Sequence, residues 1–265
     1  MSDCGPTHIR SRDNAWLKDL RRLTQDSNAY RKQSRVWLEG DHLCRAALQR
    51  GVRPQVAVFA ESLWSAASAQ WAQFALKVFV LADPLFADVS ALDSPAQIGF
   101  VLNLGELAPD KGLIQAQAPS VVLDRVQDAG NVGSILRSAS AFGFKQVLAL
   151  KGTAALWSPK VLRAGMGAHF GLRLFEGLDV VELDRLDLPL IATSSHQGGF
   201  VHQQRLPMPC AWAFGHEGQG IDPAVAAHSR LQVRICQPGG EESLNVAAAA
   251  AICLHASCAA APGMV

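Results

Sequence analysis

The chain has 265 residues, of which 49% are hydrophobic and 18% are charged, and its formal net charge is +1. This composition is typical of a globular protein with a sizeable core and excludes an intrinsically disordered chain. The charge is uneven, because residues 1–53 hold 11 basic and 6 acidic residues (+5) and the remainder holds 13 and 17 (−4). A basic N-terminal part on an acidic body favours a phosphate-rich partner, although a solvated basic helix explains the same charge.

Cysteine usage and hydropathy indicate the compartment. The 6 cysteines are scattered and form no C-x-x-C pair, which predicts reduced, mostly buried thiols in a cytoplasmic protein rather than a disulfide framework or a zinc site. The N-terminus is polar and has no apolar core of a signal peptide. The longest apolar stretch, residues 246–261, is shorter than the roughly 20 residues that span a bilayer and contains His255. We predict a buried helix there and no membrane partner.

Residues 1–105 are predicted to form a small α/β domain. Apolar residues at helical spacing predict helices, and short apolar runs predict strands. The predicted helices are 14–24, 41–49 and 65–74, and the predicted strands are 56–60, 76–81 and 98–102. Residues 106–119 contain glycine, two prolines and mixed charge without periodicity, which predicts a linker.

Residues 120–265 are predicted to form a second α/β domain. The predicted strands are 120–126, 146–150, 190–193, 210–214 and 231–236. The predicted helices are 132–142, 159–165, 223–228 and 244–259. Short apolar strands that alternate with helices predict a mostly parallel sheet covered on both faces.

Three glycine-bearing loops follow strands of this second domain. They are Asn131-Val-Gly-Ser-Ile-Leu-Arg137, Gly215-His-Glu-Gly-Gln-Gly220 and Pro238-Gly-Gly-Glu-Glu-Ser-Leu-Asn245. Loops at the carboxyl ends of parallel strands converge on one crevice, where open α/β sheets bind ligands. None matches G-x-G-x-x-G, a Walker A loop, a zincin site or a nucleophile elbow, so a nucleotide-binding oxidoreductase or hydrolase is not supported.

Polar side chains in these loops are the candidate site residues. Arg137, in an apolar helix, faces a cleft or a partner, or pairs with a neighbouring carboxylate. Glu217 lies among three glycines, and for His216 we favour a hydrogen bond to the loop backbone. Ser243 is placed to cap the helix 244–259, whereas Asn245 in its first turn has less structural reason to be there. That helix is apolar on nearly every face, which predicts enclosure on all sides and suggests a subunit interface.

These segments resemble the SpoU/TrmH family of RNA ribose 2′-O-methyltransferases in the SPOUT superfamily. Residues 128–143, 214–221 and 235–246 resemble motifs 1, 2 and 3 of that family, and residues 158–168 resemble the segment between motifs 1 and 2. Residues 11–14 and 37–43 resemble the L30e-like RNA-binding domain that is common in the family. The likeness covers nearly the whole chain. It implies an L30e-like domain over 1–105 and a knotted methyltransferase domain over 120–265.

The resemblance implies a deep trefoil knot, S-adenosylmethionine (AdoMet) as cofactor bound in a bent shape, no metal, and a homodimer. The residues that match the family's functional polar positions are Arg137, Asn131, Glu217, Ser243 and Asn245. The positions that match its cofactor pocket are Thr193, Gly215, Gly220, Ile235 and Leu244. Cys236 and Gln237 stand where the family often has Pro-Met, which leaves cofactor affinity more open than catalysis.

The implied reaction is attack of a ribose 2′-hydroxyl on the AdoMet methyl group, with RNA rather than DNA as partner and ribosomal RNA slightly favoured over transfer RNA. Arg137 would hold an RNA phosphate, or act as the general base of some family schemes, although a guanidinium strongly resists deprotonation. Asn131 would orient Arg137 or the ribose, Glu217 would anchor loops or cofactor, and Ser243 and Asn245 would order the third loop. The alternative is a non-catalytic RNA-binding factor of ribosome assembly that kept the fold.

Overall fold

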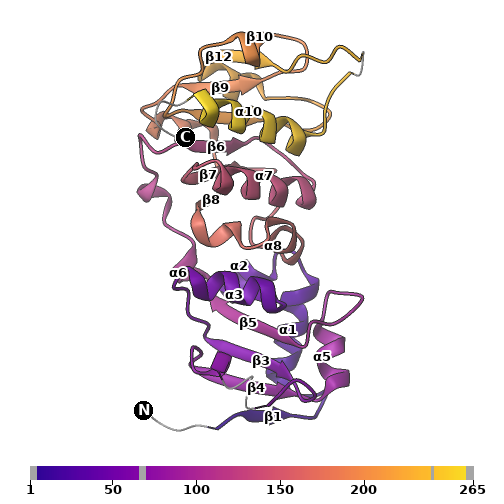
Figure 1. Cartoon of the computed structure of the whole chain (residues 1–265). Helices are drawn as coiled ribbons and strands as arrows, with labels where there is room; N and C mark the ends of the chain where they lie inside the picture. The colour runs from indigo at the N-terminus through magenta and orange to yellow at the C-terminus, as the bar shows by residue number, and fades with distance from the viewer. Residues whose placement is uncertain (1–4, 66–69, 240–241, 261–265) are drawn as a thin grey trace. The chain divides into compact units, whose positions relative to one another are not determined.

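A computed structural model describes residues 5–65, 70–239 and 242–260 (Figure 1). The chain divides into two compact units, each with its own sheet. The first unit is Met1–Leu107 with Trp157–Phe170, and the second is Ala108–Leu156 with Gly171–Val265. The sequence assigned residues 157–170 to the second domain, but their helix α8 (Pro159–Gly165) contacts β2 (Arg35–Glu39) of the first unit.

The first unit is built on a mixed five-stranded sheet in the order β1-β4-β3-β5-β2. Its other strands are β1 (Thr7–Ile9), β3 (Val56–Ala60), β4 (Lys77–Leu81) and β5 (Ile98–Asn103). Strands β1, β4 and β3 pair in parallel, and β5 pairs antiparallel with β3 and β2. Its other helices are α1 (Ala15–Gln25), α2 (Ala29–Gln33), α3 (Asp41–Gln49), α5 (Asp83–Val89) and α6 (Leu104–Leu107).

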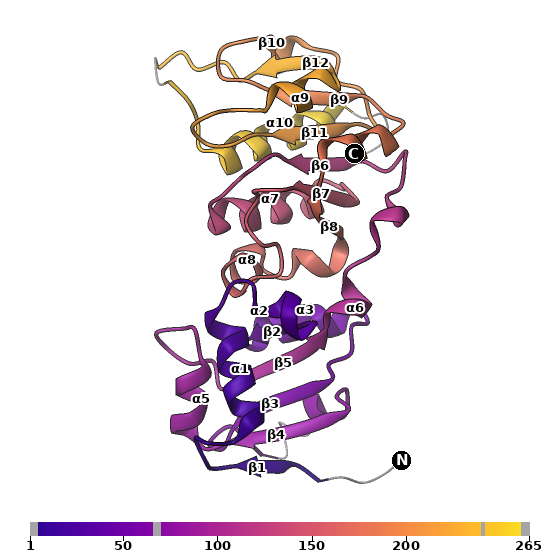
Figure 2. The same ribbon diagram turned by 180° about the vertical axis from the view of Figure 1, so that it is seen from behind.

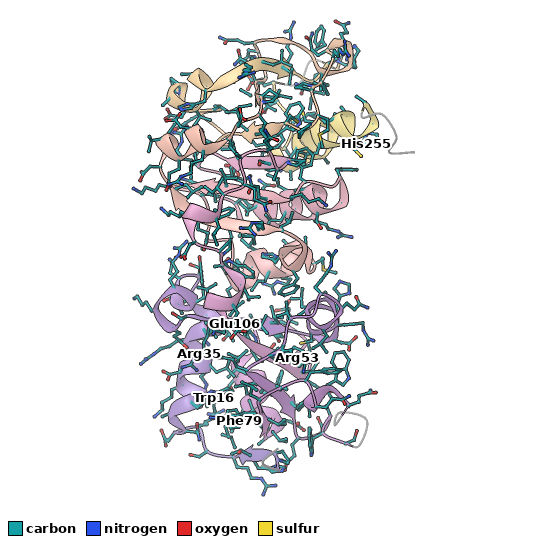
Figure 3. The ribbon with its side chains drawn as sticks, turned by 90° about the vertical axis from the view of Figure 1, so that its left-hand side faces the viewer. Trp16, Arg35, Arg53, Phe79, Glu106 and His255 are labelled. Atoms are coloured by element: carbon teal, nitrogen blue, oxygen red, sulfur yellow. The ribbon has the colours of Figure 1, made fainter. Side chains whose placement is uncertain are left out.

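Helix α1 shows how the sequence pattern sets this packing. It begins at Ala15 because the Asn14 side chain accepts a hydrogen bond from the Leu17 N–H (3.2 Å). Its apolar face buries Leu17, Leu20 and Leu23. On the flank, the Trp16 ring lies 4.3 Å from that of Phe79 on β4, centroid to centroid (Figure 3). The amphipathic spacing therefore predicted both the helix and its buried side.

Other predictions for the first unit have mixed outcomes. Those for 41–49 and 56–60 are confirmed with the same boundaries, and those for 14–24, 76–81 and 98–102 within one residue at each end. Five elements, β1, α2, β2, α5 and α6, were not predicted. The helix predicted over 65–74 falls partly on residues 66–69, which lie outside the described residues. The predicted linker is not wholly irregular, because it holds the end of α6 and a short 3-10 helix, η1 (Lys111–Leu113).

The second unit is built on a seven-stranded sheet in the order β10-β12-β9-β11-β6-β7-β8. Its strands are β6 (Ser120–Leu123), β7 (Gln146–Leu150), β8 (Arg173–Leu178), β9 (Leu190–Thr193), β10 (Gly199–Phe200), β11 (Ala211–Phe214) and β12 (Ser229–Arg234). Every neighbouring pair is parallel, which confirms the predicted α/β fold with a mostly parallel sheet.

Helices cover both faces of this sheet (Figures 1 and 2). Helices α7 (Ala129–Ala141) and α10 (Val246–Ala260) pack against each other, and Trp212 on β11 donates from Nε1 to Ser257 of α10 (2.9 Å). The neighbours of Trp212 on β11, Ala211 and Ala213, belong instead to the cluster that contains Val225 of α9 (Pro223–Ala227). Side chains that alternate along β11 are thus buried on opposite faces of the sheet, as expected for a parallel sheet that helices cover on both sides.

Two helix starts differ from prediction, and both differences come from caps. Helix α7 begins at Ala129 rather than 132, because the Asp128 carboxylate accepts the Asn131 N–H at 2.7 Å. Helix α10 begins at Val246 rather than 244, because Asn245 is its cap. The edge strands β8 and β10 were not predicted. Among the described residues, no helix is long and apolar enough to cross a membrane.

The described cysteines are all free, and three of them, Cys44, Cys210 and Cys253, are buried. Burial raises the pKa of Cys210 to about 11 and that of Cys253 to about 12. Such thiols stay protonated and unreactive near neutral pH. Cys236 departs from the predicted burial, because it is exposed between β12 and the third loop. Cys4 lies outside the described residues.

Candidate functional site

The three glycine-bearing loops leave the carboxyl ends of parallel strands at one edge of the second unit's sheet. The first follows β6, the second follows its neighbour β11, and the third follows β12. From β6 the chain continues to β7 and β8 on one side, and later strands are added on the other. The strand order therefore reverses between β6 and β11, which is the position where α/β sheets form their ligand crevice.

A chain of side-chain hydrogen bonds joins all three loops. Asn131 of the first loop donates from Nδ2 to Glu217 Oε1 of the second (3.2 Å). The Oδ1 of Asn131 accepts from Nδ2 of Asn245 in the third loop (2.9 Å). These residues are 86 and 114 positions apart in the sequence, so only the fold brings them together. Three of the five predicted polar site residues therefore meet at one point.

The second loop is held in a tight ring. His216 and Gly220 exchange backbone hydrogen bonds (3.0 and 2.9 Å), and Gly220 has a φ of +69°. The His216 Nδ1 accepts from the N–H groups of Gly218 and Gln219 (3.0 and 3.2 Å), which confirms the favoured role of His216. A Cβ on Gly215 would lie 2.3 Å from the Gly220 carbonyl carbon, so no side chain fits there. The glycines allow this close approach of the loop to itself.

The Glu217 carboxylate at the tip of this ring is stabilised in its charged form. Partial burial by itself raises the pKa of Glu217. Hydrogen bonds from its own N–H, from the Asn131 amide and from the N–H groups of Gln127 and Asp128 outweigh burial and lower the pKa below its ordinary value. The loops are therefore bound to each other best when Glu217 is ionised.

This pKa direction predicts how the site responds to acid. Because folding lowers the pKa of Glu217, its contribution to stability is present above the ordinary glutamate pKa of about 4.3 and is lost as the pH falls through the lowered value. We expect the melting temperature of wild type to fall more steeply below about pH 4.3 than that of E217Q, which has no carboxyl at this position. Thermal unfolding of both proteins between neutral and acidic pH measures the difference. Parallel curves would show that Glu217 carries none of the acid sensitivity.

Asn245 has a second role that the sequence assigned to Ser243. Its Oδ1 accepts from the N–H groups of Ala247 and Ala248 (2.9 and 3.2 Å), so Asn245 caps α10 while its Nδ2 reaches Asn131. The prediction that Ser243 caps this helix is wrong, because the helix begins two residues later than expected. Ser243 is exposed in the loop.

Arg137 is separate from this hydrogen-bonded group. It lies on the exposed side of α7 with Gly130, Ser134 and Ala141, about 9 Å along the helix axis from Asn131 at ~1.5 Å per residue. Among the described residues it makes no hydrogen bond or ion pair, so the alternative of pairing with a neighbouring carboxylate is not seen. A positive side chain without an internal partner is available for an anion from outside.

The predicted cofactor-lining positions lie around the same strand ends. Thr193 is the last residue of β9, and its Oγ1 donates to the Ala213 carbonyl of the neighbouring strand β11 (3.0 Å). This hydroxyl is therefore used within the sheet. Ile235 is partly exposed directly after β12, and Leu244 is 39% exposed beside Asn245.

The sequence did not single out Asp124 and Arg125, although adjacent opposite charges after a buried strand are an unusual pattern.

Comparisons with known proteins show which family the chain resembles. The model of the SpoU rRNA Methylase family matches residues 118–255. The chain is 29% identical over 253 residues to the 23S rRNA (guanosine(2553)-2'-O)-methyltransferase RlmP of Bacillus subtilis, over 93% of this chain and 97% of that protein. It is 31% identical over 265 residues to an uncharacterized tRNA/rRNA methyltransferase of Synechocystis, over 93% and 92% of the two chains.

Solved structures give the same result. The structure of an RNA 2'-O ribose methyltransferase is 29% identical and superposes with a TM-score of 0.77 over 95% of this chain and 98% of that chain. An AdoMet-bound rRNA methyltransferase from Sinorhizobium meliloti has the same fold, with a TM-score of 0.84 at 24% identity over 95% and 97% of the two chains. Family model and full-length relatives agree, and this chain belongs to the SpoU rRNA methylase family.

Proposed function

We propose that this chain is an enzyme that methylates a ribose 2′-hydroxyl of ribosomal RNA with AdoMet as the methyl donor. The observation that carries the proposal is the Asn245–Asn131–Glu217 hydrogen-bonded chain, which ties the three family motifs together at one edge of a parallel sheet. The relatives named as ribosomal RNA methyltransferases support ribosomal over transfer RNA. The knot of the second unit, the L30e-like RNA-binding character of the first and a cytoplasmic location belong to the same proposal.

The segment that leads from β12 into the third loop has a polar group that suits a cofactor. The Gln237 Oε1 atom is buried and has no hydrogen-bond partner in the described part of the chain. A buried acceptor of this kind requires a donor, and an amino group of AdoMet supplies one. Bound AdoMet would provide a methyl group already activated by its sulfonium charge. The residues that would hold AdoMet beside the second loop are Gln237, Ile235 and Leu244. In that loop, Gly215 lets the backbone of Gly220 and Ile221 approach closely.

The protein's own contribution is then to position the acceptor ribose. Arg137 would bind the adjacent phosphate through its planar fork of donors and so direct the 2′-hydroxyl. Asn131 is held at both ends of its amide, by Glu217 and by Asn245, and would present a fixed polar group to the ribose. We assign Arg137 to phosphate binding and not to proton removal, because a guanidinium stays protonated in proteins.

The direct test is incubation of the purified protein with tritiated AdoMet and either ribosomal or transfer RNA. We expect label in ribosomal RNA, on ribose after digestion to nucleosides. Label on a base would contradict ribose methylation and would indicate a base methyltransferase. The alternative, a non-catalytic ribosome-assembly factor, predicts RNA binding together with no heat of binding for AdoMet or S-adenosylhomocysteine in calorimetry.

We also propose a homodimer formed through the second unit. Helix α10 is not enclosed on all sides within one chain, because it buries Ala250, Cys253, Leu254 and Ser257 and leaves Ile252 42% exposed. His255, which is labelled in Figure 3, lies on the exposed side of α10. Its ring meets the Phe142 ring edge-on, with the ring centroids 5.4 Å apart. A mostly alanine helix with an exposed apolar side is suited to a self-complementary contact with a second copy of the chain.

Charge on that side of α10 should prevent dimer formation. We expect I252D to be monomeric at concentrations where wild type is a dimer, because a desolvated carboxylate without a partner opposes association. Light scattering coupled to size exclusion measures the mass of both. The control is V181D, which places the same charge at an apolar residue that is 67% exposed outside α10. A dimeric I252D, or a monomeric V181D, would refute α10 as the interface.

A further inference from the structure

Asp124 and Arg125 form a tight ion pair where β6 ends. The Asp124 side chain is 2% exposed, and its two oxygens accept from Nε and Nη2 of Arg125 (2.8 and 3.1 Å). Arg125 adopts a φ of +58°, a conformation that bulky residues seldom adopt. Gly152 leaves space for it, since a Cβ there would lie 3.1 Å from the Arg125 Cγ. The backbone at this point is thus arranged to turn the guanidinium back onto its neighbour.

Both members of the pair also bind the second loop. The Asp124 Oδ2 accepts from the Asp222 N–H (2.6 Å), at the point where the loop enters α9. Arg125 Nη1 donates to Gln219 Oε1 (3.0 Å), and its Nη2 lies 3.8 Å from the Asp222 carboxylate. Each partner is nearly a hundred residues away in the sequence. The pair therefore anchors the base of the loop to the end of β6.

The same loop is attached to the first loop at its tip, through Glu217. Between the two attachments, the hydrogen bonds of His216 with Gly220 make the loop a closed ring. Gln219, which Arg125 holds, lies in this ring two residues after Glu217, so the anchor at Arg125 restrains the part of the loop that meets Asn131. A simple apolar pair would fill the space below the loop at lower desolvation cost. An oriented, bidentate ion pair instead fixes direction.

We propose that Arg125, with Asp124, is a positioning residue that holds the second loop in the geometry that AdoMet binding requires. The inference rests on the proposed function, and it adds a role for two residues outside the three glycine-bearing loops. Arg125 acts through Gln219 and the loop ring and does not touch the reacting groups. The pair prepares the loop before the methyl donor arrives, so its loss should affect cofactor binding more than RNA binding.

Two variants weaken the attachment of Arg125 to the second loop to different extents. R125M keeps a long side chain but removes every donor, and Q219L removes one contact at an exposed position without disturbing buried Asp124. We expect AdoMet to bind about tenfold more weakly to R125M and about threefold more weakly to Q219L, with RNA affinity within about twofold of wild type. K151M is the control, because it breaks an exposed ion pair with Asp179 in the same unit (2.7 Å).

Hydrogen exchange supplies a readout that does not depend on activity. We expect the amides of Gly218, Gln219 and Gly220 to exchange faster in R125M and Q219L, and to be unchanged in K151M. If R125M fails to fold, Q219L carries the test alone. Wild-type exchange and AdoMet affinity in both R125M and Q219L would overturn the positioning role. A wild-type protein that binds no AdoMet would instead refute the proposed function, while the exchange result would still judge the anchor.

Coupling between sites gives the final criterion. If Arg125 acts through Glu217, then the double variant R125M/E217Q loses less AdoMet affinity than the product of the two single losses, since both remove the same support. Fully multiplicative losses would show that the two residues act independently, and would overturn the proposed route from Arg125 to the site.

Discussion

Replacement of Arg137 by alanine is expected to lower the rate of ribose methylation at least about 100-fold, the effect typical of losing one oriented donor that stabilises a transition state. AdoMet affinity should stay within about twofold. The reason is position: the side chain is exposed on α7 and has no partner among the described residues, so its loss removes no internal contact. For the same reason the free energy of unfolding should change by less than about 0.5 kcal/mol.

Two further variants separate geometry from charge in this experiment. R137K keeps the charge but not the planar fork, and we expect it to recover only part of the lost rate. R185A removes another exposed arginine of the second unit and should methylate at the wild-type rate. Single-turnover rates with saturating RNA measure all three. A wild-type rate for R137A would show that Arg137 of α7 has no role in methyl transfer.

The second large effect is expected at Asn131. N131A leaves the Glu217 carboxylate and the Asn245 amide without the group that links them, so it disturbs all three loops at once. We expect a loss of methylation of about 100-fold or more. We also expect a loss of stability of about 1–3 kcal/mol, the range for a hydrogen-bond partner left unsatisfied. Activity and denaturant unfolding measured on the same preparation give both numbers.

Asn245 provides the matched comparison. N245D keeps an oxygen that caps α10 but loses the Nδ2 donor to Asn131, whereas N245A loses both and should cost about 1 kcal/mol more in stability. If the three side chains act as one unit, N131A/N245D will be little worse than N131A, since additivity fails for residues in one network. Independent, multiplicative effects on the rate would show that Asn245, Asn131 and Glu217 do not act as one unit.

Local pattern was sufficient for much of the fold. The boundaries of α3, β3, β7, α8 and β9 were predicted correctly from the sequence, because hydrophobic periodicity and nearby caps determine such elements within a few residues. The edge strands β1, β2, β8 and β10 were missed, since a strand at an edge is specified by its partner more than by its own pattern.

For the site, the sequence by itself determined which segments matter: three loops after apolar strands, with Asn131, Glu217 and Asn245 among their polar residues. Tertiary structure decided how those residues are used. It placed Asn131 between two partners, made Asn245 rather than Ser243 the cap of α10, and brought Gln219 and Asp222 to the ion pair of Asp124 with Arg125. Periodicity and capping act over a few residues, whereas the contacts of Asn131 with its two partners and of the ion pair with Gln219 and Asp222 join positions 86 to 114 apart. Strand order sets which of these positions meet.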